Sequence, residues 1–282
     1  MPELRAPDGR SLAYDVYEPS GGVTPRAAIL WVGGWSDHRT RWRAPAGRLR
    51  DAGYAVYVLD QRGQGDSGGV RGHLSRFSQL LGDLQAFRRM VRQRGGGDLP
   101  HVLLGHSFGG LVVLRYLETQ PSDAVAGAVL SAPWLATALP VALWKHFAAK
   151  VLADLWPTAR FKTGLDSAAL ARDPAVALEY DADAAVHRIM TPGAWREIQW
   201  AQRVVPVDAH RIECPLLFLL GGADRIVDVG TTRRLADGLR NGKAGGKGID
   251  VRVYAESYHE LLHDQESDTV IGDVLAFLGK MG

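Results

Sequence analysis

A serine between two glycines is the residue of this chain whose setting is best suited to chemistry. Ser107 lies in the run Gly105-His106-Ser107-Phe108-Gly109, which has the pattern Gly-x-Ser-x-Gly. The apolar residues 101–104 before it are typical of a buried strand, and residues 111–117 after it are typical of a buried helix. A sharp strand-to-helix turn of this kind strains the serine backbone and exposes its Oγ. We therefore predict that Ser107 is a nucleophile, although a loop serine between turn glycines would show the same five residues.

A serine hydroxyl needs a base to become a strong nucleophile, and the base must be held by a third group. On this kind of turn, the acid and then the histidine follow the serine along the chain. Asp224 comes shortly after the apolar run 216–220, and His259 comes shortly after the expected strand that ends at Tyr254. We predict that His259 transfers the proton and that Asp224 fixes the tautomer of its ring.

Neighbouring residues could take these roles instead. Asp228 could replace Asp224, but its place at the start of an expected helix is typical of a cap. His263 could replace His259, but it lies further from the strand end. His106 adjoins the serine, and we expect its side chain to point away from the site and to pack. Four further histidines have no partner at metal-ligand spacing and are interpreted as core or surface residues: His101, His146, His187 and His210.

Attack on an acyl group also requires two N–H groups that stabilise the developing oxyanion. One is expected from the residue after the nucleophile, which is Phe108. The other is expected from the loop after an earlier strand, and that loop is Gly33-Gly34-Trp35. We predict that the backbone N–H groups of Phe108 and Trp35 form this oxyanion hole.

Apolar strands alternate with helical segments along most of the chain. After an edge strand at 11–17, the expected strands are 27–32, 54–59, 101–104, 125–131, 215–220 and 249–254. This alternation indicates an α/β protein with a doubly wound, mostly parallel sheet. Since the carboxyl ends of parallel strands meet at one edge of the sheet, we expect the serine, the acid and the histidine to meet there.

The alternation stops between residues 133 and 206, where the sequence shows helical patterns and prolines but no strand of the buried type. We interpret 133–206 as a helical cap, or lid, inserted into a core formed by residues 1–132 and 207–282. Residues 143–155 carry an apolar face formed by Leu143, Phe147, Val151 and Leu155. This face either packs on the core or makes transient contact with lipid aggregates or a membrane surface.

Composition restricts the class of protein. The 282 residues are 46% hydrophobic and carry a net charge of only +2, which is ordinary for a globular enzyme and does not indicate nucleic-acid binding. Cys214 is the only cysteine, so no intrachain disulfide can form. The first residues have no apolar stretch typical of a signal peptide, and a cytoplasmic enzyme is expected. The sequence does not indicate an oligomeric state.

Motifs spread over nearly the whole chain form a pattern that is similar to one known family. They are Gly34-Trp35-Ser36-Asp37-His38 with Arg41, Asp60–Gly65 with Ser67-Gly68-Gly69 and Arg71-Gly72-His73, Gly105–Gly109, Ser131-Ala132-Pro133, residues 170–174 and 180–183, Gly222-Ala223-Asp224 and Tyr258-His259-Glu260. The chain thereby resembles the monoacylglycerol lipase and lysophospholipase family of serine hydrolases, the hydrolase-4 or PldB-like group of the α/β-hydrolase superfamily. The resemblance implies an ester hydrolase that acts on one-chain glycerides or lysolipids and needs no cofactor.

The resemblance also implies a binding site for the substrate head group. In the resembled lipases an acid, an arginine and a second histidine bind this group, and Asp37, Arg41 and His263 stand at or near those positions. A surface ion pair with an unrelated histidine would give the same residues. Gly33 and Gln64 replace two histidines that are usual in the family. A small-ester esterase, an acyltransferase and a non-catalytic ligand-binding protein on the same fold remain alternatives.

Overall fold

The computed structural model describes residues 2–95, 99–120, 125–138, 143–241 and 248–281. Within these ranges an eight-stranded sheet has the order β1-β2-β4-β3-β5-β6-β9-β10. Its strands are β1 (Glu3–Arg5), β2 (Ser11–Tyr17), β3 (Ala28–Val32), β4 (Ala55–Leu59), β5 (His101–His106), β6 (Gly127–Ser131), β9 (Leu216–Gly221) and β10 (Ile249–Tyr254). The pairs β1–β2 and β2–β4 are antiparallel, and all other neighbours are parallel. The predicted α/β class with a mostly parallel sheet is therefore confirmed.

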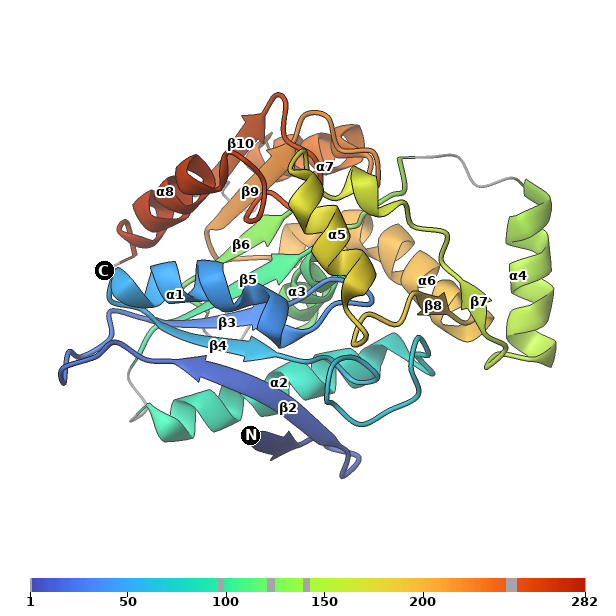
Figure 1. Cartoon of the computed structure of the whole chain (residues 1–282), viewed down its shortest axis with the longest axis horizontal. Helices are drawn as coiled ribbons and strands as arrows, with labels where there is room; N and C mark the ends of the chain where they lie inside the picture. The colour runs from blue at the N-terminus through green and yellow to red at the C-terminus, as the bar shows by residue number, and fades with distance from the viewer. Residues whose placement is uncertain (1, 96–98, 121–124, 139–142, 242–247, 282) are drawn as a thin grey trace.

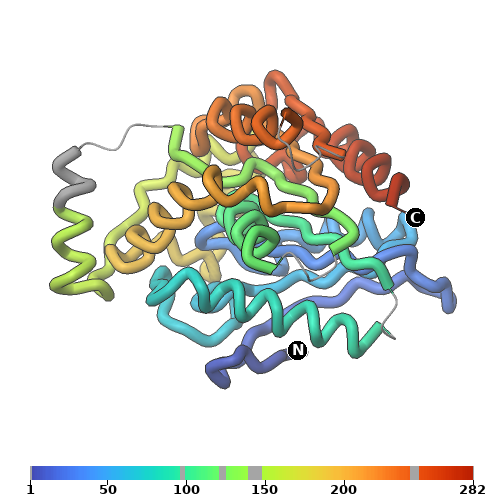
Figure 2. The backbone as a smooth tube through the Cα atoms, turned by 180° about the vertical axis from the view of Figure 1, so that it is seen from behind, coloured from blue at the N-terminus to red at the C-terminus, as the bar shows by residue number. Residues whose placement is uncertain are grey.

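Helices cover both faces of the sheet, so its central strands are buried on both sides (Figure 1). One face packs against α1 (Arg43–Asp51) and α8 (Ser267–Leu278). The other packs against α2 (Phe77–Arg94), α3 (Phe108–Thr119) and α7 (Val229–Asn241), with α2 and α3 seen from behind in Figure 2. Burial on both sides explains why β3, β4 and β9 are continuously apolar rather than alternating.

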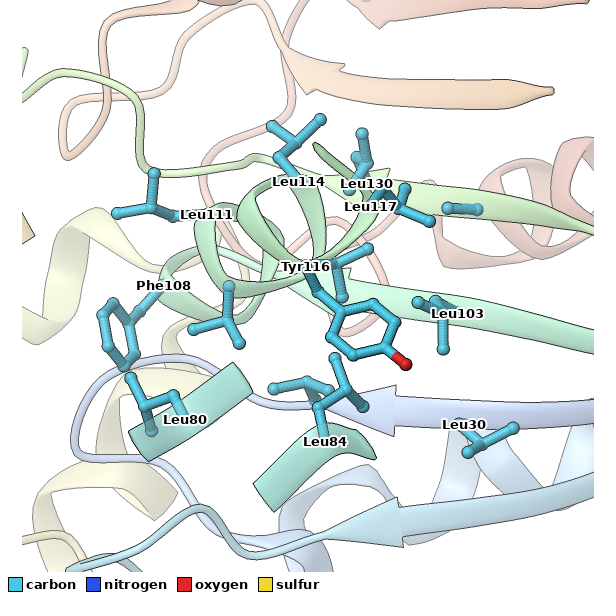
Figure 3. Packing of buried hydrophobic residues seen from close by; sticks show 14 of the residues in the cluster. Leu30, Leu80, Leu84, Leu103, Phe108, Leu111, Leu114, Tyr116, Leu117 and Leu130 are labelled. Carbon is cyan, nitrogen blue, oxygen red and sulfur yellow. The ribbon is translucent and has the colours of Figure 1, made fainter. Parts of the chain in front are cut away.

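Helix α3 follows the serine turn and is buried in the core along most of its length. Its side chains Leu111, Leu114 and Tyr116 are fully buried and belong to the same cluster as Leu103 of β5 and Leu130 of β6 (Figure 3). Each fully buried leucine of this kind contributes about 1.5–3 kcal/mol of transfer free energy. The first turn of α3 therefore has a fixed position relative to the end of β5.

The segment between β6 and β9 contains mainly helices, as the sequence predicts. Its elements are α4 (Leu143–Leu155), β7 (Phe161–Lys162), α5 (Pro174–Ala182), β8 (Ile189–Met190) and α6 (Pro192–Asp208), with a 3-10 turn at Ser167–Ala169. The strands β7 and β8 form only a two-residue antiparallel ribbon. Helix α6 buries Ala194, Ile198 and Ala201 in the main core against α3, so the expected cap boundary at residue 206 falls inside a core-packed helix.

Helix α4 lies at the periphery of the molecule against α6, in both Figure 1 and Figure 2. The side chains of Leu143 and Phe147 lie outside the part of the chain whose side chains are described. At the other end of the helix and just after it, Val151, Leu155 and Trp156 are 39%, 79% and 64% exposed. Across the described ranges, no helix has the length and apolarity that a membrane span requires.

Candidate active site

Ser107 occupies a strained turn between β5 and α3. Its φ of 51° and ψ of −115° lie in a region that side-chain-bearing residues rarely adopt. A Cβ on Gly105 would lie 2.7 Å from the Cα of Gly110, and a Cβ on Gly109 would lie 2.0 Å from the carbonyl oxygen of Val32. Only glycine fits at these two positions, which is the physical reason for the Gly-x-Ser-x-Gly pattern.

The acid and the histidine approach one another at the same edge of the sheet, after β9 and β10. Asp224 Oδ2 lies 2.8 Å from Nδ1 of His259. The other carboxylate oxygen accepts from the backbone N–H groups of Ile226, at 2.7 Å, and Val227, at 3.0 Å. Burial by itself lowers the pKa of His259, but the carboxylates of Asp224, Glu260 and Asp37, with Asp224 contributing most, together offset this and raise the pKa above its usual value. The bond to Nδ1 leaves Nε2 as the ring nitrogen that can accept a proton.

The two rival residues have other partners. Asp228 Oδ1 accepts from the backbone N–H of Thr231 at 2.6 Å, as a cap at the start of α7 does. Nδ1 of His263 lies 2.9 Å from Glu260 Oε2, and Nε2 lies 3.0 Å from the carbonyl oxygen of Arg41. These contacts favour Asp224 and His259 as the interacting pair.

His106 packs in the protein interior, where it contacts the histidine after β10. Its ring centroid is 5.0 Å from that of His259 and 5.0 Å from that of Trp42. Burial and the neighbouring His259 hold the pKa of His106 well below its usual value, so this ring is neutral. A neutral ring adds no positive charge beside His259 and supports its orientation by packing.

The loop after β3 lies directly against the serine turn. A Cβ on Gly34 would be 3.5 Å from the Cβ of Ser107, and the Trp35 ring contacts the Phe108 ring with centroids 5.1 Å apart. The backbone N–H groups of Trp35 and Phe108 donate to no other residue in the described part of the chain. Both groups therefore meet a basic requirement for the predicted oxyanion hole, which is that their hydrogens are not used elsewhere in the protein.

Asp37 forms hydrogen bonds that hold this loop in place. Its Oδ2 accepts from the backbone N–H of Gly34 at 3.1 Å and from Trp42 Nε1 at 2.7 Å, while its own N–H donates to Gln64 Oε1 at 2.9 Å. A Cβ on Gly33 would lie 2.9 Å from Asp37 Oδ2. The two departures from the family pattern thus have a physical explanation. Glycine at 33 leaves room for the carboxylate, and glutamine at 64 holds the Asp37 backbone.

Asp37, Arg41 and His263 come together, and they share a partner that the sequence did not single out for the site. Arg41 donates from both Nη atoms to the two oxygens of Glu260, each at 2.8 Å, and also to Asp37 at 3.2 Å. Burial would raise the pKa of Glu260, but Arg41 and His263 hold it well below its usual value. The sequence feature that could have identified Glu260 as a site residue is its position directly after His259. The pair between Asp37 and Arg41 is buried rather than on the surface.

Two aromatic rings complete this group of side chains. The Trp42 ring stacks on His263 with centroids 4.6 Å apart, and the Tyr180 ring of α5 lies 5.0 Å from the Arg41 guanidinium carbon. The inserted segment therefore contacts the site through α5. Neither here nor at any other place in the described ranges is a group of three or more histidine, cysteine, aspartate or glutamate side chains arranged to hold a metal ion.

The fold and the serine turn define a class of protein, and comparison with known families agrees. Residues 23–266 match the Hydrolase_4 family, described as serine aminopeptidase, S33, and the chain belongs to this family. It is 33% identical over 273 residues to the monoacylglycerol lipase of Mycolicibacterium smegmatis, covering 96% of this chain and 93% of that relative. The resemblance derived from the motifs is confirmed, and the chain is an enzyme of the monoacylglycerol lipase-like serine hydrolases.

Two further relatives support the same conclusion. The phospholipase YtpA of Bacillus subtilis is 28% identical over 255 residues, covering 90% of this chain and 95% of the relative. The crystal structure of the Paleococcus ferrophilus monoacylglycerol lipase has a TM-score of 0.83 and 27% identity, covering 96% of this chain and 99% of that one.

Proposed function

We propose that this enzyme hydrolyses carboxylic esters of single-chain lipids through an acyl-enzyme on Ser107. As Ser107 Oγ attacks the ester carbonyl carbon, Nε2 of His259 takes the hydroxyl proton and Asp224 stabilises the charged ring. The carbonyl oxygen becomes an oxyanion that accepts from the N–H groups of Trp35 and Phe108. Collapse of the intermediate breaks the ester bond, and the departing alcohol takes the proton from His259. A water molecule then attacks the acyl-enzyme in the same way, giving its proton to His259. The bond to Ser107 breaks, Ser107 takes the proton back, and the fatty acid is released.

The observation that carries this proposal is the 2.8 Å contact between His259 and Asp224 at the sheet edge that also holds the strained Ser107 turn. A strained serine, a histidine with its tautomer fixed and two backbone donors are the parts that acyl transfer requires. The lipid part of the proposal is supported by the relatives, whose names are monoacylglycerol lipase and phospholipase.

The inserted segment gives independent support for a lipid substrate. Leu155 and Trp156 at the end of α4 and Phe161 of β7 are large apolar side chains that lie exposed near one another in the sequence. We propose that this segment is a cap over the site and that these side chains make transient contact with lipid aggregates. An exposed apolar group of this kind is typical of surfaces that insert into the boundary of a bilayer or micelle.

A comparison of Ser107→Ala with the unaltered enzyme tests the proposed reaction. The variant should keep its fold and lose roughly 10⁴-fold or more in kcat on monoacylglycerols, lysophospholipids and p-nitrophenyl esters. A fluorophosphonate probe should label the parent protein and leave the variant unlabelled. Normal turnover by Ser107→Ala would show that another residue is the nucleophile. Turnover of none of these esters by the parent protein would favour a non-catalytic binding protein.

The role of Asp37, Arg41 and His263 in binding a glycerol head group stays a prediction. The contacts between them provide a competing role, because most of their polar atoms already bond within the protein. In that role they would fix the loop that holds Trp35 and the loop that holds His259. The two roles predict different effects on substrates with and without a glycerol head group.

A further inference from the structure

Three basic side chains near the oxyanion loop have hydrogen-bond donors with no acceptor. Arg71, from the Arg71-Gly72-His73 motif, makes no hydrogen bond or ion pair with any described residue, and its Nη1 atom is buried. Nε2 of His187 is likewise buried without a partner. Arg160 is exposed and has no ion-pair partner among the described residues. Buried donors without acceptors are uncommon in folded proteins, and an acceptor from outside the chain is one explanation for them.

Other partly buried arginines of this chain have a different environment. Arg39, Arg41, Arg62 and Arg115 each form an ion pair with at least one carboxylate at 3.2 Å or less. Arg71 differs from these four arginines because it has no carboxylate partner among the described residues. Its guanidinium is therefore free to bind an anion that comes from outside the chain.

Contacts between backbone segments place these side chains beside the site. The N–H of Thr191, next to β8, donates to the carbonyl oxygen of Gly72 at 3.0 Å, so the loop that carries Arg71 lies against the inserted segment. Trp35 Nε1 donates to the carbonyl oxygen of Ile189 at 2.9 Å, and the ring of His187 contacts that of Trp35 with centroids 6.1 Å apart. Since Trp35 is an expected oxyanion donor, these groups adjoin the position of a bound ester.

The proton on His187 can be assigned from its partners. The backbone N–H of Ile189 donates to Nδ1 at 3.1 Å, so Nδ1 is an acceptor and the neutral ring carries its hydrogen on Nε2. Burial, Arg71 and Arg160 together lower the pKa of His187 to about 4. The ring is therefore a neutral donor at neutral pH, and the charges acting on it are both positive. Arg160 directly precedes β7, which pairs with β8 two residues from His187.

We infer that Arg71, His187 and Arg160 form a subsite for the phosphate of a single-chain phospholipid whose ester carbonyl lies at Ser107. This inference rests on the proposed ester hydrolase function and assigns a head-group class to it. A phosphodiester supplies the acceptor oxygens and the negative charge that these donors lack. The arginine fork matches phosphate geometry, and hydrogen bonds between charged partners are stronger than those between neutral ones.

The test compares 1-octanoyl lysophosphatidylglycerol with 1-octanoylglycerol, both below their micelle concentrations. The two substrates share the acyl ester and its glycerol and differ by the phosphoglycerol group, which carries the only charge. Arg71→Gln should lower the ratio of kcat/KM for the phospholipid to kcat/KM for the glyceride by about tenfold. Arg160→Gln should lower it by about threefold, since that side chain is exposed. Arg233→Gln, which removes another exposed charge, from α7, should leave the ratio unchanged.

A binding measurement separates failure of the subsite from failure of the proposed function. Calorimetry on Ser107→Ala should show a Kd for the lysophospholipid about tenfold weaker when Arg71→Gln is added, whether or not the parent protein hydrolyses either lipid. An unchanged Kd together with an unchanged kcat/KM ratio would overturn the subsite. Inhibition by inorganic phosphate that Arg71→Gln removes, with no change in the substrate ratio, would instead assign a site for free phosphate and also overturn the inference. If Arg71→Gln does not fold by circular dichroism, Arg160→Gln provides the same comparisons.

Discussion

At the scale of single residues, the choice between two aspartates decides how the histidine works. Only the carboxylate bonded to Nδ1 of His259 can hold its tautomer, and that is Asp224. We expect Asp224→Asn to lower kcat by about 10⁴-fold, the typical cost of the wrong tautomer. Asp228→Asn is the matched control, because asparagine keeps an oxygen that can accept from the Thr231 N–H at the start of α7 and only the charge is removed, so kcat should change little. Steady-state kinetics on a p-nitrophenyl ester measure both, and a larger loss at position 228 would reverse the assignment.

Glu260 provides a second prediction at this scale, through the pH dependence of the rate. In the proposed mechanism His259 must be neutral to accept a proton, so kcat/KM should fall as pH decreases through its raised pKa. The negative charge of Glu260 contributes to that raised pKa, after the larger contribution of Asp224. Glu260→Gln should therefore lower the pKa of His259 and move the acid limb of the profile to lower pH.

The matched control for this experiment is Glu256→Gln, an exposed position in the same loop. It should leave the acid limb where it is. A profile of Glu260→Gln that keeps its midpoint and only loses amplitude would mean that Glu260 supports the fold and does not tune His259. The melting temperature of each variant distinguishes a general loss of folded protein from a shift of the pKa.

At the scale of elements, the loop after β3 depends on the absence of a side chain at Gly33. A methyl group there would lie 2.9 Å from the Asp37 carboxylate that holds the N–H of Gly34. We expect Gly33→Ala to displace this loop and lower kcat more than it raises KM, because the proposed oxyanion donor Trp35 moves with it. Gly47→Ala in α1 is the control, since its nearest neighbour is a flexible arginine tip at 3.9 Å and alanine favours a helix. A Gly33→Ala enzyme with normal kcat would show that the loop does not position a catalytic donor.

The second prediction at this scale concerns the exposed apolar side chains at the end of helix α4. If Leu155 and Trp156 contact lipid aggregates, then Leu155→Ser with Trp156→Ser should reduce activity on long-chain substrates in micelles or vesicles while activity on monomeric short esters is retained. The melting temperature should change little, because both side chains are exposed and bury little area. Equal loss on both substrates with a lower melting temperature would indicate that these residues pack in the protein. Val151→Ser is a graded comparison, since that side chain is less exposed.

At the scale of the whole molecule, the sequence predicts features that depend on residues near one another in the chain, such as strands and motifs. It does not predict features that depend on contacts between distant segments. The sheet follows from continuous apolar runs, and Ser107 follows from a local motif with its flanking strand and helix. Asp224 and His259 follow from chain order at the carboxyl ends of two strands. The ion pair of Arg41 with Glu260 joins residues more than 200 positions apart, and no local pattern predicts it. The packing of α6 on α3 was missed for the same reason, because its apolar face does not show which surface it meets.

The group formed by Asp37, Arg41, Glu260 and His263 connects the oxyanion loop, the histidine loop and, through Tyr180, the inserted segment. If Arg41 binds glycerol, Arg41→Ala should weaken kcat/KM for monoacylglycerols by roughly 1–3 kcal/mol, the cost of leaving buried polar partners unpaired. The same variant should affect p-nitrophenyl esters of equal chain length much less, because they carry no glycerol.

If Arg41 instead holds the two loops in place, both substrates should lose activity in parallel and the melting temperature should fall, since Glu260 is left buried without its main partner. His263→Ala distinguishes the two roles further. It leaves the bidentate bond between Arg41 and Glu260 intact, so a purely supporting network should respond less to this change than to Arg41→Ala. A selective loss on monoacylglycerols in both variants would assign the group to the head group, and parallel losses that follow the melting temperatures would assign it to the architecture of the site.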